Sequence, residues 1–480
     1  MNEALRKPSF LEAIIGFTLI LGVMIVGIGF KVGMQTPILF GAITAAVVAL
    51  YLGNKWEQIQ EWIIKGISYS MVANIILMFS GMLVGLWIIG GTVPTLIYYG
   101  LDLISPSIFL PMTFLICIAT SLATGTSFGT ISTVGLALLG VSMGLGVPAP
   151  MTVGAVVSGA FFGDKMSPIS DTTNIAPAMA GATLFDHIGS MLWTTLPAAI
   201  ISLILYAIIG SEYGTNTTDM SMVADIMSTI DANFNVSLVT VIPPFLLLVL
   251  SFKRVSAIPA LAIVVFVSMI LPFFTQGIFF SDIIASTMRG YNSETGLAIV
   301  DKILSRGGIS MMTESIVMII AATAMGGILD NSGIMQVLIS KMLKSVKTYR
   351  GLIPVTLISG LSIVLATGNM ILGSIIVGRT FKDAYKDMDI HPKVLSRSLE
   401  DVGTLTNSII PWGGACIFIQ AVMSIDLSYI PYAFLNYLTP CISMIFGLTG
   451  IAVWTINGKP VLKKAAKKAL KKEQAIAISH

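Results

Sequence analysis

The chain has 480 residues, of which 55% are apolar and 11% are charged. A soluble domain carries about 25% charged residues, so this composition excludes a soluble globular protein and indicates a polytopic membrane protein. The net charge of +3 says little by itself, and we expect no nucleic-acid partner and no cofactor. The three cysteines lie in apolar runs without CxxC spacing, which indicates packing residues rather than a disulfide framework or a zinc site.

The first apolar run, from Phe10 to Phe30, is about 20 residues long and predicts a retained membrane span rather than a signal peptide. Arg6 and Lys7 precede it, and residues 457–480 form a lysine-rich tail. Cytoplasmic loops carry an excess of Lys and Arg, so both termini are predicted to be cytoplasmic. The segment 211–236 contains Asp and Glu without Lys or Arg, which predicts an acidic extracytoplasmic linker.

Two halves of the chain share short sequences at a constant separation. Gly66 and Gly308 lie in similar tetrapeptides, GTVPTLI at residue 91 resembles GIMQVLI at residue 333, and Ala-Thr-Gly occurs at residues 123 and 366. The separations are 242 (308 − 66), 242 (333 − 91) and 243 (366 − 123). This pattern predicts two repeats, residues 1–210 and 237–456. Each would carry five spans, an odd number, so the second repeat would be inverted in the membrane, as in many secondary transporters.

A re-entrant hairpin is predicted in each repeat. One apolar segment, residues 351–378, separates the basic stretches 341–350 and 379–397, and it is too short for two crossings, which need about 40 residues. The repeat predicts the matching hairpin at residues 107–146, entering from the opposite face. Non-helical backbone at membrane depth is tolerated where it lines a cavity, so two opposed tips predict a central site. The predicted tip residues are Thr124, Thr126 and Ser127 in the first repeat, and Thr367 and Asn369 in the second.

An interrupted span is predicted after each hairpin, at residues 150–182 and 398–425. The first contains GDKMSPISDTTNIAPAMAG, in which we align Thr173-Asn174 with Thr406-Asn407 of the second. Gly and Pro interrupt helices and leave half-helix ends that bind ions. Asp171, Thr172, Thr173 and Asn174 supply the oxygen ligands that a hard cation prefers, which predicts a Na+ site at Asp171, Thr173 and Asn174. Burial favours the neutral form of a carboxylate, so a proton competes with Na+ for Asp171.

Each of these residues has a structural alternative. Hydroxyl and amide side chains in spans commonly hydrogen-bond to neighbouring helices, although a cluster at a helix break favours a site. Asp164 and Lys165 form either a structural ion pair or a coupling pair. Glu400 and Asp401, at a predicted span entrance, are either solvated caps or members of a proton relay. Glu314, in an apolar run, is either a relay group or bonded to a neighbouring serine.

Residues 125–129 match the G-x-S-x-G motif of serine hydrolases, which makes an intramembrane serine hydrolase a remote alternative. It would need a base for Ser127, and His187 is predicted to be a solvated histidine at the membrane edge. The second tip has no serine, whereas a hairpin tip explains both copies. We therefore expect a transporter rather than an enzyme.

At GDKMSPISDTTNIAP the chain resembles the NhaC family of bacterial Na+/H+ antiporters, within the larger ion transporter superfamily, and the resemblance covers roughly Pro8 to Trp454. The resemblance implies an all-helical fold with opposed hairpins, elevator-like alternating access and a homodimer. It also implies that Asp164 and Asp171 to Asn174 form the cation site. The family includes exchangers of malate and lactate and of amino acids, which the motif does not separate.

These observations predict an all-α secondary transporter that exchanges Na+ for protons across a bacterial cytoplasmic membrane, with lipid as its surroundings. Na+- and H+-coupled exchange of a small carboxylate or an amino acid is the alternative. No intramembrane arginine that could clamp a carboxylate is evident in the sequence, which favours plain cation exchange.

Overall fold

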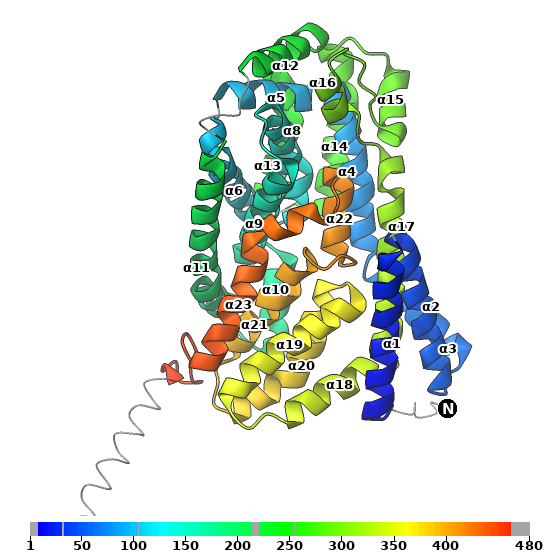
Figure 1. The fold of residues 1–480 in the computed structure, drawn as a ribbon, viewed down its shortest axis with the longest axis vertical. Coiled ribbons are helices and arrows are strands. Elements are labelled where there is room, and N and C mark those ends of the chain that lie inside the picture. Colours follow the sequence, from blue (N-terminus) through cyan, green and yellow to red (C-terminus); the bar gives the residue numbers. More distant parts are fainter. Residues whose placement is uncertain (1–7, 31–32, 104, 214–219, 254, 462–480) are drawn as a thin grey trace, which may run out of the picture.

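A computed structural model describes residues 8–30, 33–103, 105–213, 220–253 and 255–461 of the chain. Within these residues the regular structure is helical, apart from one isolated bridge between Trp454 and Pro460. The helices form a tall bundle, with the first and last described residues at the same end (Figure 1). The predicted all-α membrane fold is therefore confirmed, because most of these helices are apolar and several are long enough to cross a bilayer.

The first half of the chain contains the helices α1 (Phe10–Gly29), α2 (Gln35–Tyr51), α3 (Trp56–Ser68), α4 (Met71–Ile89), α5 (Thr92–Leu103), α6 (Pro106–Thr124), α7 (Ser127–Thr130), α8 (Leu136–Gly144), α9 (Ala149–Met166), α10 (Asp171–Ala180) and α11 (Leu184–Ser211). A π-helical turn, Ile131–Gly135, joins α7 to α8.

The second half contains α12 (Met220–Asn233), α13 (Ile242–Phe252), α14 (Ala257–Thr275), α15 (Phe280–Arg289), α16 (Ala298–Leu304), α17 (Ile309–Asn331), α18 (Ile334–Lys344), α19 (Tyr349–Thr367), α20 (Met370–Asp387), α21 (Pro392–Asn407), α22 (Gly414–Met423) and α23 (Phe434–Thr449). Short 3-10 helices precede α13 (Leu238–Val241) and α23 (Leu427–Tyr432).

Eight described helical segments are long and apolar enough to span a membrane, or nine if the bent pair of α12 and α13 counts as one span. Three of the eight, Pro106–Thr124, Ser127–Gly144 and Tyr349–Thr367, belong to helix–turn–helix units at the predicted hairpin positions. The broken helices α9–α10 and α21–α22 are not among them, because α10 and α22 are short and α9 and α21 carry charged residues. The predicted total of ten spans and two hairpins stays a prediction.

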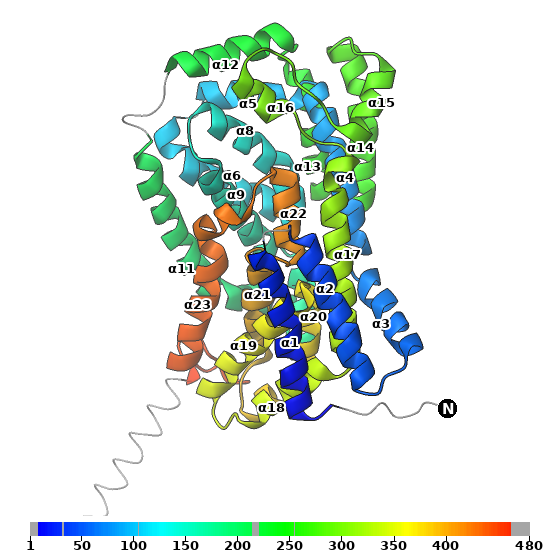
Figure 2. The ribbon, with the colours of Figure 1, turned by 45° about the vertical axis from the view of Figure 1, so that its right-hand side comes forward.

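Two helix–turn–helix units lie toward opposite ends of the molecule. α6 is joined to α7 and α8 through Gly125, which has φ 68°, and Thr126 caps the start of α7. α19 is joined to α20 through Gly368, which has φ 62°, and Asn369 caps the start of α20. Figures 1 and 2 show α5 and α8 near one end and α18, α19 and α20 near the other. A left-handed conformation costs glycine little, which explains a glycine at both turns.

The two halves repeat the same succession of elements. α6 and α19, α9 and α21, and α10 and α22 each begin 243 residues apart (349 − 106, 392 − 149 and 414 − 171). The broken helices are interrupted at residues 167–170 and 408–413, and each interruption contains a proline, Pro168 or Pro411. Proline cannot donate a helical hydrogen bond, and the two prolines lie 243 residues apart (411 − 168), so the interruptions contain equivalent helix-breaking residues.

This correspondence corrects one predicted alignment. Thr173 and Asn174 lie in α10, after the first break, whereas Thr406 and Asn407 end α21, before the second break. The two pairs are therefore not equivalent, and the residue equivalent to Asn407 is Asp164 (407 − 164 = 243). Both stretches are polar, which made a direct alignment attractive, but the helix boundaries decide the register.

The segment predicted as an acidic linker contains an amphipathic helix. Val223, Ile226, Ile230 and Phe234, spaced by three or four residues along α12, are buried, while Asp225 and Asp231 are exposed. Apolar residues at this spacing form one helical face, and α12 packs with it against α5, α8 and α16. The predicted basic N-terminus at Arg6 and Lys7, and most of the lysine-rich tail, lie outside the described residues.

Candidate functional site

The carboxylate of Asp164 lies where the first hairpin meets the first broken helix. Asp164 is in the last turn of α9 and is 5% exposed. Ser127, the first residue of α7, donates a hydrogen bond of 2.6 Å to Oδ2, and Ser170, in the break, donates one of 2.5 Å to Oδ1. The Ser170 hydroxyl also lies 3.1 Å from that of Thr172. Three hydroxyl oxygens and a carboxylate therefore gather at the hairpin tip.

Asp171 is not buried, contrary to the prediction that burial favours its neutral form. It is the first residue of α10 and is exposed, while its neighbours Thr172 and Thr173 are buried. A carboxylate at a helix N-terminus interacts favourably with the helix dipole, which gives Asp171 a local structural role. The buried carboxylate of this motif is Asp164, seven residues earlier.

Thr173 and Asn174 hold the break together. The Thr173 hydroxyl donates to the carbonyl oxygens of Asp164, at 3.1 Å, and Lys165, at 2.9 Å. The Asn174 amide donates to the carbonyl oxygens of Pro168, at 3.0 Å, and Ser170, at 2.7 Å. The Asp164 carbonyl also accepts from the Ser167 N–H, at 3.3 Å, and the Ser170 carbonyl from the Asn174 N–H, at 3.2 Å. The two side chains therefore add to the backbone hydrogen bonds around the break.

Lys165 pairs with Asp401 of the second repeat and not with Asp164. Its Nζ atom lies 2.6 Å from Asp401 Oδ1, and both side chains are fully buried. Thr194 of α11 donates to the same oxygen at 3.0 Å, and Arg397 Nε lies 3.9 Å from Oδ2. The predicted coupling of Asp164 with Lys165 is therefore replaced by an ion pair that joins α9 to α21.

Glu400 and Asp401 are both 0% exposed, so the alternative of solvated caps is wrong. Glu400 accepts a hydrogen bond of 3.0 Å from Thr404, and its Oε2 atom has no hydrogen-bond partner among the described residues. The prediction failed because residues 379–397 were taken as a basic loop. The helix α21 instead begins at Pro392 and is buried on all sides from Val394 onward.

Ser127 has a carboxylate as its partner rather than a histidine. His187 is fully buried in the first turn of α11, and its Nδ1 atom lies 2.9 Å from the hydroxyl of Ser396. The prediction of a solvated histidine is therefore wrong. His391 caps the start of α21, where it accepts a hydrogen bond from the backbone of Lys393. Neither histidine is bonded to Ser127, which leaves the hydrolase alternative without support.

The predicted site residues of the second repeat bond mainly to backbone. Thr367 and Thr406 donate to carbonyl oxygens four residues earlier, Ile363 and Val402. Asn369 accepts from the backbone of Ile371 and Leu372. Asn407 donates to the carbonyl of Gly368 at 2.8 Å and accepts from the backbone N–H of Ala415 at 2.7 Å. The second tip is thus closed by protein groups.

The remaining predicted residues lie apart from Asp164 or bond within the tip. Glu314 of α17 is exposed and accepts a hydrogen bond of 2.7 Å from Gln35 of α2, so its partner is a distant glutamine and not the predicted neighbouring serine. Thr126 accepts from the backbone of Gly129 at 3.2 Å. The hydroxyl oxygen of Thr124 is buried and has no hydrogen-bond partner among the described residues.

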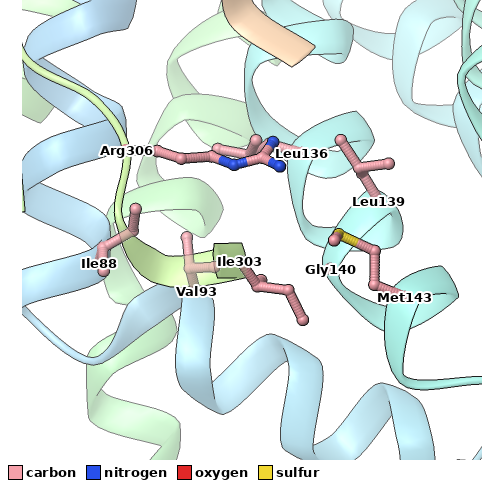
Figure 3. Close-up of a pocket in the computed structure, with 8 residues that line it drawn as sticks. All are labelled: Ile88, Val93, Leu136, Leu139, Gly140, Met143, Ile303 and Arg306. Carbon is pink, nitrogen blue, oxygen red and sulfur yellow. The ribbon is translucent and has the colours of Figure 1, made fainter. Parts of the chain in front are cut away.

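Two arginines that the sequence prediction missed are partly or fully buried. Arg397 is 0% exposed, and its Nη1 atom donates to the carbonyl of Ala452 at 2.8 Å. Arg306 lies beside a small cavity lined by apolar side chains of α4, α5, α8 and α16 (Figure 3), and its Nη1 atom donates to the carbonyl of Met423 at 3.1 Å. A cation is favourable at the C-terminus of α22. The signal available for Arg397 was its position four residues before Asp401, on the same helical face.

Comparison with known proteins adds the family. A family model described as the Na+/H+ antiporter family matches residues 2–173 and 159–451. The Na(+)/H(+) antiporter NhaC of Alkalihalophilus pseudofirmus is 36% identical over 452 residues, which cover 92% of this chain and 97% of that protein. The malate-2H(+)/Na(+)-lactate antiporter of Bacillus subtilis is 34% identical and covers 95% of this chain and 98% of its own length.

The arginine/ornithine antiporter ArcD of Halobacterium salinarum is 33% identical, over 93% of both chains. These relatives match along almost their whole length, so the similarity includes both hairpin turns and both broken helices. The resemblance inferred from the residues around Asp164 is confirmed, and the chain belongs to the Na+/H+ antiporter family.

Proposed function

We propose that this protein exchanges Na+ for protons across a bacterial cytoplasmic membrane and that Asp164 is the carboxylate that binds them in turn. The observation that carries the proposal is the burial of Asp164 between the hydroxyls of Ser127 and Ser170. A hydroxyl that donates to a carboxylate keeps lone pairs that can coordinate Na+. Oxygen atoms are the ligands that hard cations prefer. The proposed Na+ site is therefore at Asp164 and not at Asp171, Thr173 and Asn174, the ligands predicted from the sequence.

Exchange at this site needs one proton and one ion to compete. When Asp164 releases its proton, the carboxylate binds Na+ with help from the oxygens of Ser127, Ser170 and Thr172. After reorientation toward the other side, a proton displaces the ion. Both ligands neutralise the same carboxylate, so the binding of one displaces the other. This competition is the condition for antiport.

The buried charges beside Asp164 provide a route for protons. Glu400 and Asp401 remain the candidates for a relay, since each has a buried oxygen without a hydrogen-bond partner among the described residues. The Nε2 atom of His187 and the Nη2 atom of Arg397 are also buried and have no hydrogen-bond partner among the described residues. Buried polar atoms of this kind are commonly satisfied by ordered water, which conducts protons. The exposed Glu314 has no such surroundings and is dropped from the relay.

The reorientation is proposed to be elevator-like, with the repeats inverted in the membrane. Support comes from the position of the two helix–turn–helix units toward opposite ends of the molecule (Figures 1 and 2) and from the two broken helices between them. Inverted repeats with discontinuous helices at the binding site are common among secondary transporters. Cytoplasmic termini and a homodimer complete the proposal, the latter on the resemblance alone.

The alternative is Na+- and H+-coupled exchange of a small carboxylate or an amino acid. One relative is named for exchange of malate and lactate with H+ and Na+, and another for exchange of arginine and ornithine. The buried Arg397 also removes the argument that no arginine could bind a carboxylate. Against it, the groups that meet at Asp164 are hydroxyls, which carry no positive charge for a solute carboxylate. In the second repeat, Thr406 and Asn407 donate to backbone, whereas Asn369 bonds through its oxygen and keeps its amide N–H groups. We therefore favour plain cation exchange.

The test is internal pH in proteoliposomes that contain the purified protein and an imposed Na+ gradient. We expect Na+ alone to drive proton movement and Asp164→Asn to abolish it. Asp171→Asn should retain exchange, because Asp171 is exposed. Asp282→Asn, an exposed carboxylate in α15, is the matched control and should be fully active. Exchange by the Asp164→Asn variant, or movement only after malate, lactate or arginine is added, would contradict the proposal.

A further inference from the structure

The two hairpin tips close in chemically different ways, although they occupy equivalent positions. Asp164 and Asn407 lie 243 residues apart, as the helices that carry them do (407 − 164; 392 − 149). The packing of the tips agrees with this register. A Cβ atom added to Gly125 would lie 3.0 Å from Ile169, and one added to Gly368 would lie 2.6 Å from the carbonyl oxygen of Trp412, which is 243 residues after Ile169 (412 − 169).

In the second repeat, a neutral side chain closes the tip. The Asn407 amide donates to the carbonyl of Gly368, the turn residue of the hairpin, and its oxygen accepts from the backbone N–H at the start of α22. The Gly414 N–H also donates to the Gly368 carbonyl, at 2.9 Å. Hairpin, break and half-helix are therefore tied together by a donor and an acceptor on one side chain.

In the first repeat, the corresponding side chain is a carboxylate, which has no donor when it is ionised. The two bonds that Asp164 makes to side chains are both accepted from hydroxyls. Among the described residues, no hydrogen bond reaches the carbonyl of Gly125, the equivalent of Gly368. A protonated carboxyl group has one donor and one acceptor, as an amide does. A Na+ ion between the carboxylate and a carbonyl would join the same two oxygens electrostatically.

We infer that the Gly125 carbonyl is a further ligand of the transported cation, and that the turn at Gly125 is tied to Asp164 only when Asp164 carries a proton or Na+, whereas Ser127 donates to Asp164 in either state. In the second repeat the Asn407 amide joins the hairpin turn to the broken helix permanently, without a bound ion. This inference rests on the proposed function, because it assumes that Asp164 binds both ions. It explains why the empty carrier would not reorient, because an ionised carboxylate has no donor for the Gly125 carbonyl.

Other charges near Asp164 modulate this closure. They come from α9, α10, α11 and α21, and comprise Lys165, Asp171, His187, Arg397, Glu400 and Asp401. Lys165 is paired with Asp401, so it does not replace the missing donor at the tip. α7 contributes only hydroxyls, Ser127 and Thr130, and no charge.

The experiment is hydrogen–deuterium exchange of the full-length protein in lipid nanodiscs, at one alkaline pH, with NaCl or choline chloride. Peptides that cover residues 121–130 and 364–373 report on the two tips. We expect Na+ to slow exchange at the first tip by about tenfold, the effect of one hydrogen bond to a charged group, and to leave the second tip unchanged. Protection of neither tip, or of both alike, would overturn the inference.

Two variants test the chemistry of closure. Asp164→Asn supplies a permanent donor, so its first tip should be protected without Na+ and insensitive to Na+. Asn407→Asp removes the donor at the second tip, which should then exchange faster and become sensitive to Na+. Asn233→Asp, at the exposed end of α12, is the matched control for the second change and should alter neither tip. If Asn407→Asp does not fold, the wild type and Asp164→Asn decide the question.

The inference and the proposed function fail in different ways. If Na+ protects the first tip but drives no proton movement in proteoliposomes, the cation site stands and the proposed exchange falls. If Na+ drives proton movement and Asp164→Asn abolishes it, but Na+ leaves the first tip unprotected, the exchange stands and closure by the ion is refuted. A first tip in Asp164→Asn that exchanges as fast as in the Na+-free wild type also refutes closure.

Discussion

Lys165 and Asp401 show how much one ion pair contributes to the stability of this membrane protein. They are 236 positions apart in the chain, fully buried, and 2.6 Å from each other. Removal of one partner leaves an uncompensated charge in a medium of low dielectric constant, whereas removal of both leaves none. The pair therefore ties the first broken helix to the second, at the position where the two repeats meet.

We predict that Lys165→Met destabilises the protein by about 3–5 kcal/mol, because Asp401 is then buried without its main partner. The Lys165→Met, Asp401→Leu double variant should recover most of this loss. Thermal unfolding of the purified protein in detergent measures both. Lys302→Met, an exposed lysine in α16, is the control. A single variant as stable as the wild type would show that the pair is not a structural link.

The candidate site was predictable from the sequence only in part. The motif from Gly163 to Gly181 indicated a polar cluster at a helix break, and the structure has one there. The choice between Asp164 and Asp171 was not predictable, because both are acidic residues in an apolar region. Exposure separates them, and exposure depends on α6 and α7, which cover Asp164, and on a break that turns Asp171 outward.

At the scale of helices, α21 is the element that departs most from ordinary sequence patterns. It carries charged or polar residues around its circumference, yet it is buried from Val394 to Asn407. A helix of this composition usually faces water. Here α9, α10, α11, α19, α20 and α23 surround it and supply partners such as Lys165 and Thr194. The hydropathy of the sequence therefore predicted a loop where the first turns of α21 lie.

Glycine allows the helices α3 and α17 to pack with their backbones almost in contact. A Cβ atom added to Gly327 would lie 2.2 Å from the carbonyl oxygen of Trp62, and one added to Gly66 would lie 2.2 Å from that of Thr323. Real Cβ atoms do not approach backbone so closely, so any larger residue must separate the helices. Small residues at helix contacts are typical of membrane proteins.

We predict that Gly327→Ala destabilises the protein by about 1–3 kcal/mol through overpacking at this contact. Gly22→Ala is the matched control, because a Cβ atom there would meet nothing within 4 Å. The melting temperature of each variant in detergent is the measurement. Equal melting temperatures would mean that α3 moves aside without cost.

At the scale of the whole molecule, the balance of charge differs between the two ends. The exposed acids Asp225 and Asp231 lie on α12 at one end, beside the exposed Arg289 and Lys302 of α15 and α16 (Figure 1). At the other end, α18 and α20 carry the exposed Lys341, Lys344 and Lys386 as well as Asp383 and Asp387. Basic residues favour the cytoplasmic side of a membrane. The excess of lysine near α18 and α20 therefore favours the prediction that this end, and with it both termini, is cytoplasmic.

We predict that Ser228→Cys, on α12, reacts with a membrane-impermeant thiol reagent added to intact cells, and that Ser345→Cys, after α18, reacts only in inverted vesicles. Both serines are exposed. Cys441 is exposed and should first be replaced by serine, whereas Cys117 and Cys416 are buried. Labelling of Ser345→Cys from outside would reverse the topology.

The sequence by itself determined the all-helical membrane class, the positions of the turns at Gly125 and Gly368, and the polar motif, because these follow from local composition and from residues that helices exclude. The tertiary structure decided which carboxylate is buried, which lysine neutralises which acid, and how the repeats align. Those properties depend on desolvation and on contacts between helices far apart in the chain. A local sequence pattern does not show these properties, because an acidic residue costs free energy when it is buried and little when it is exposed.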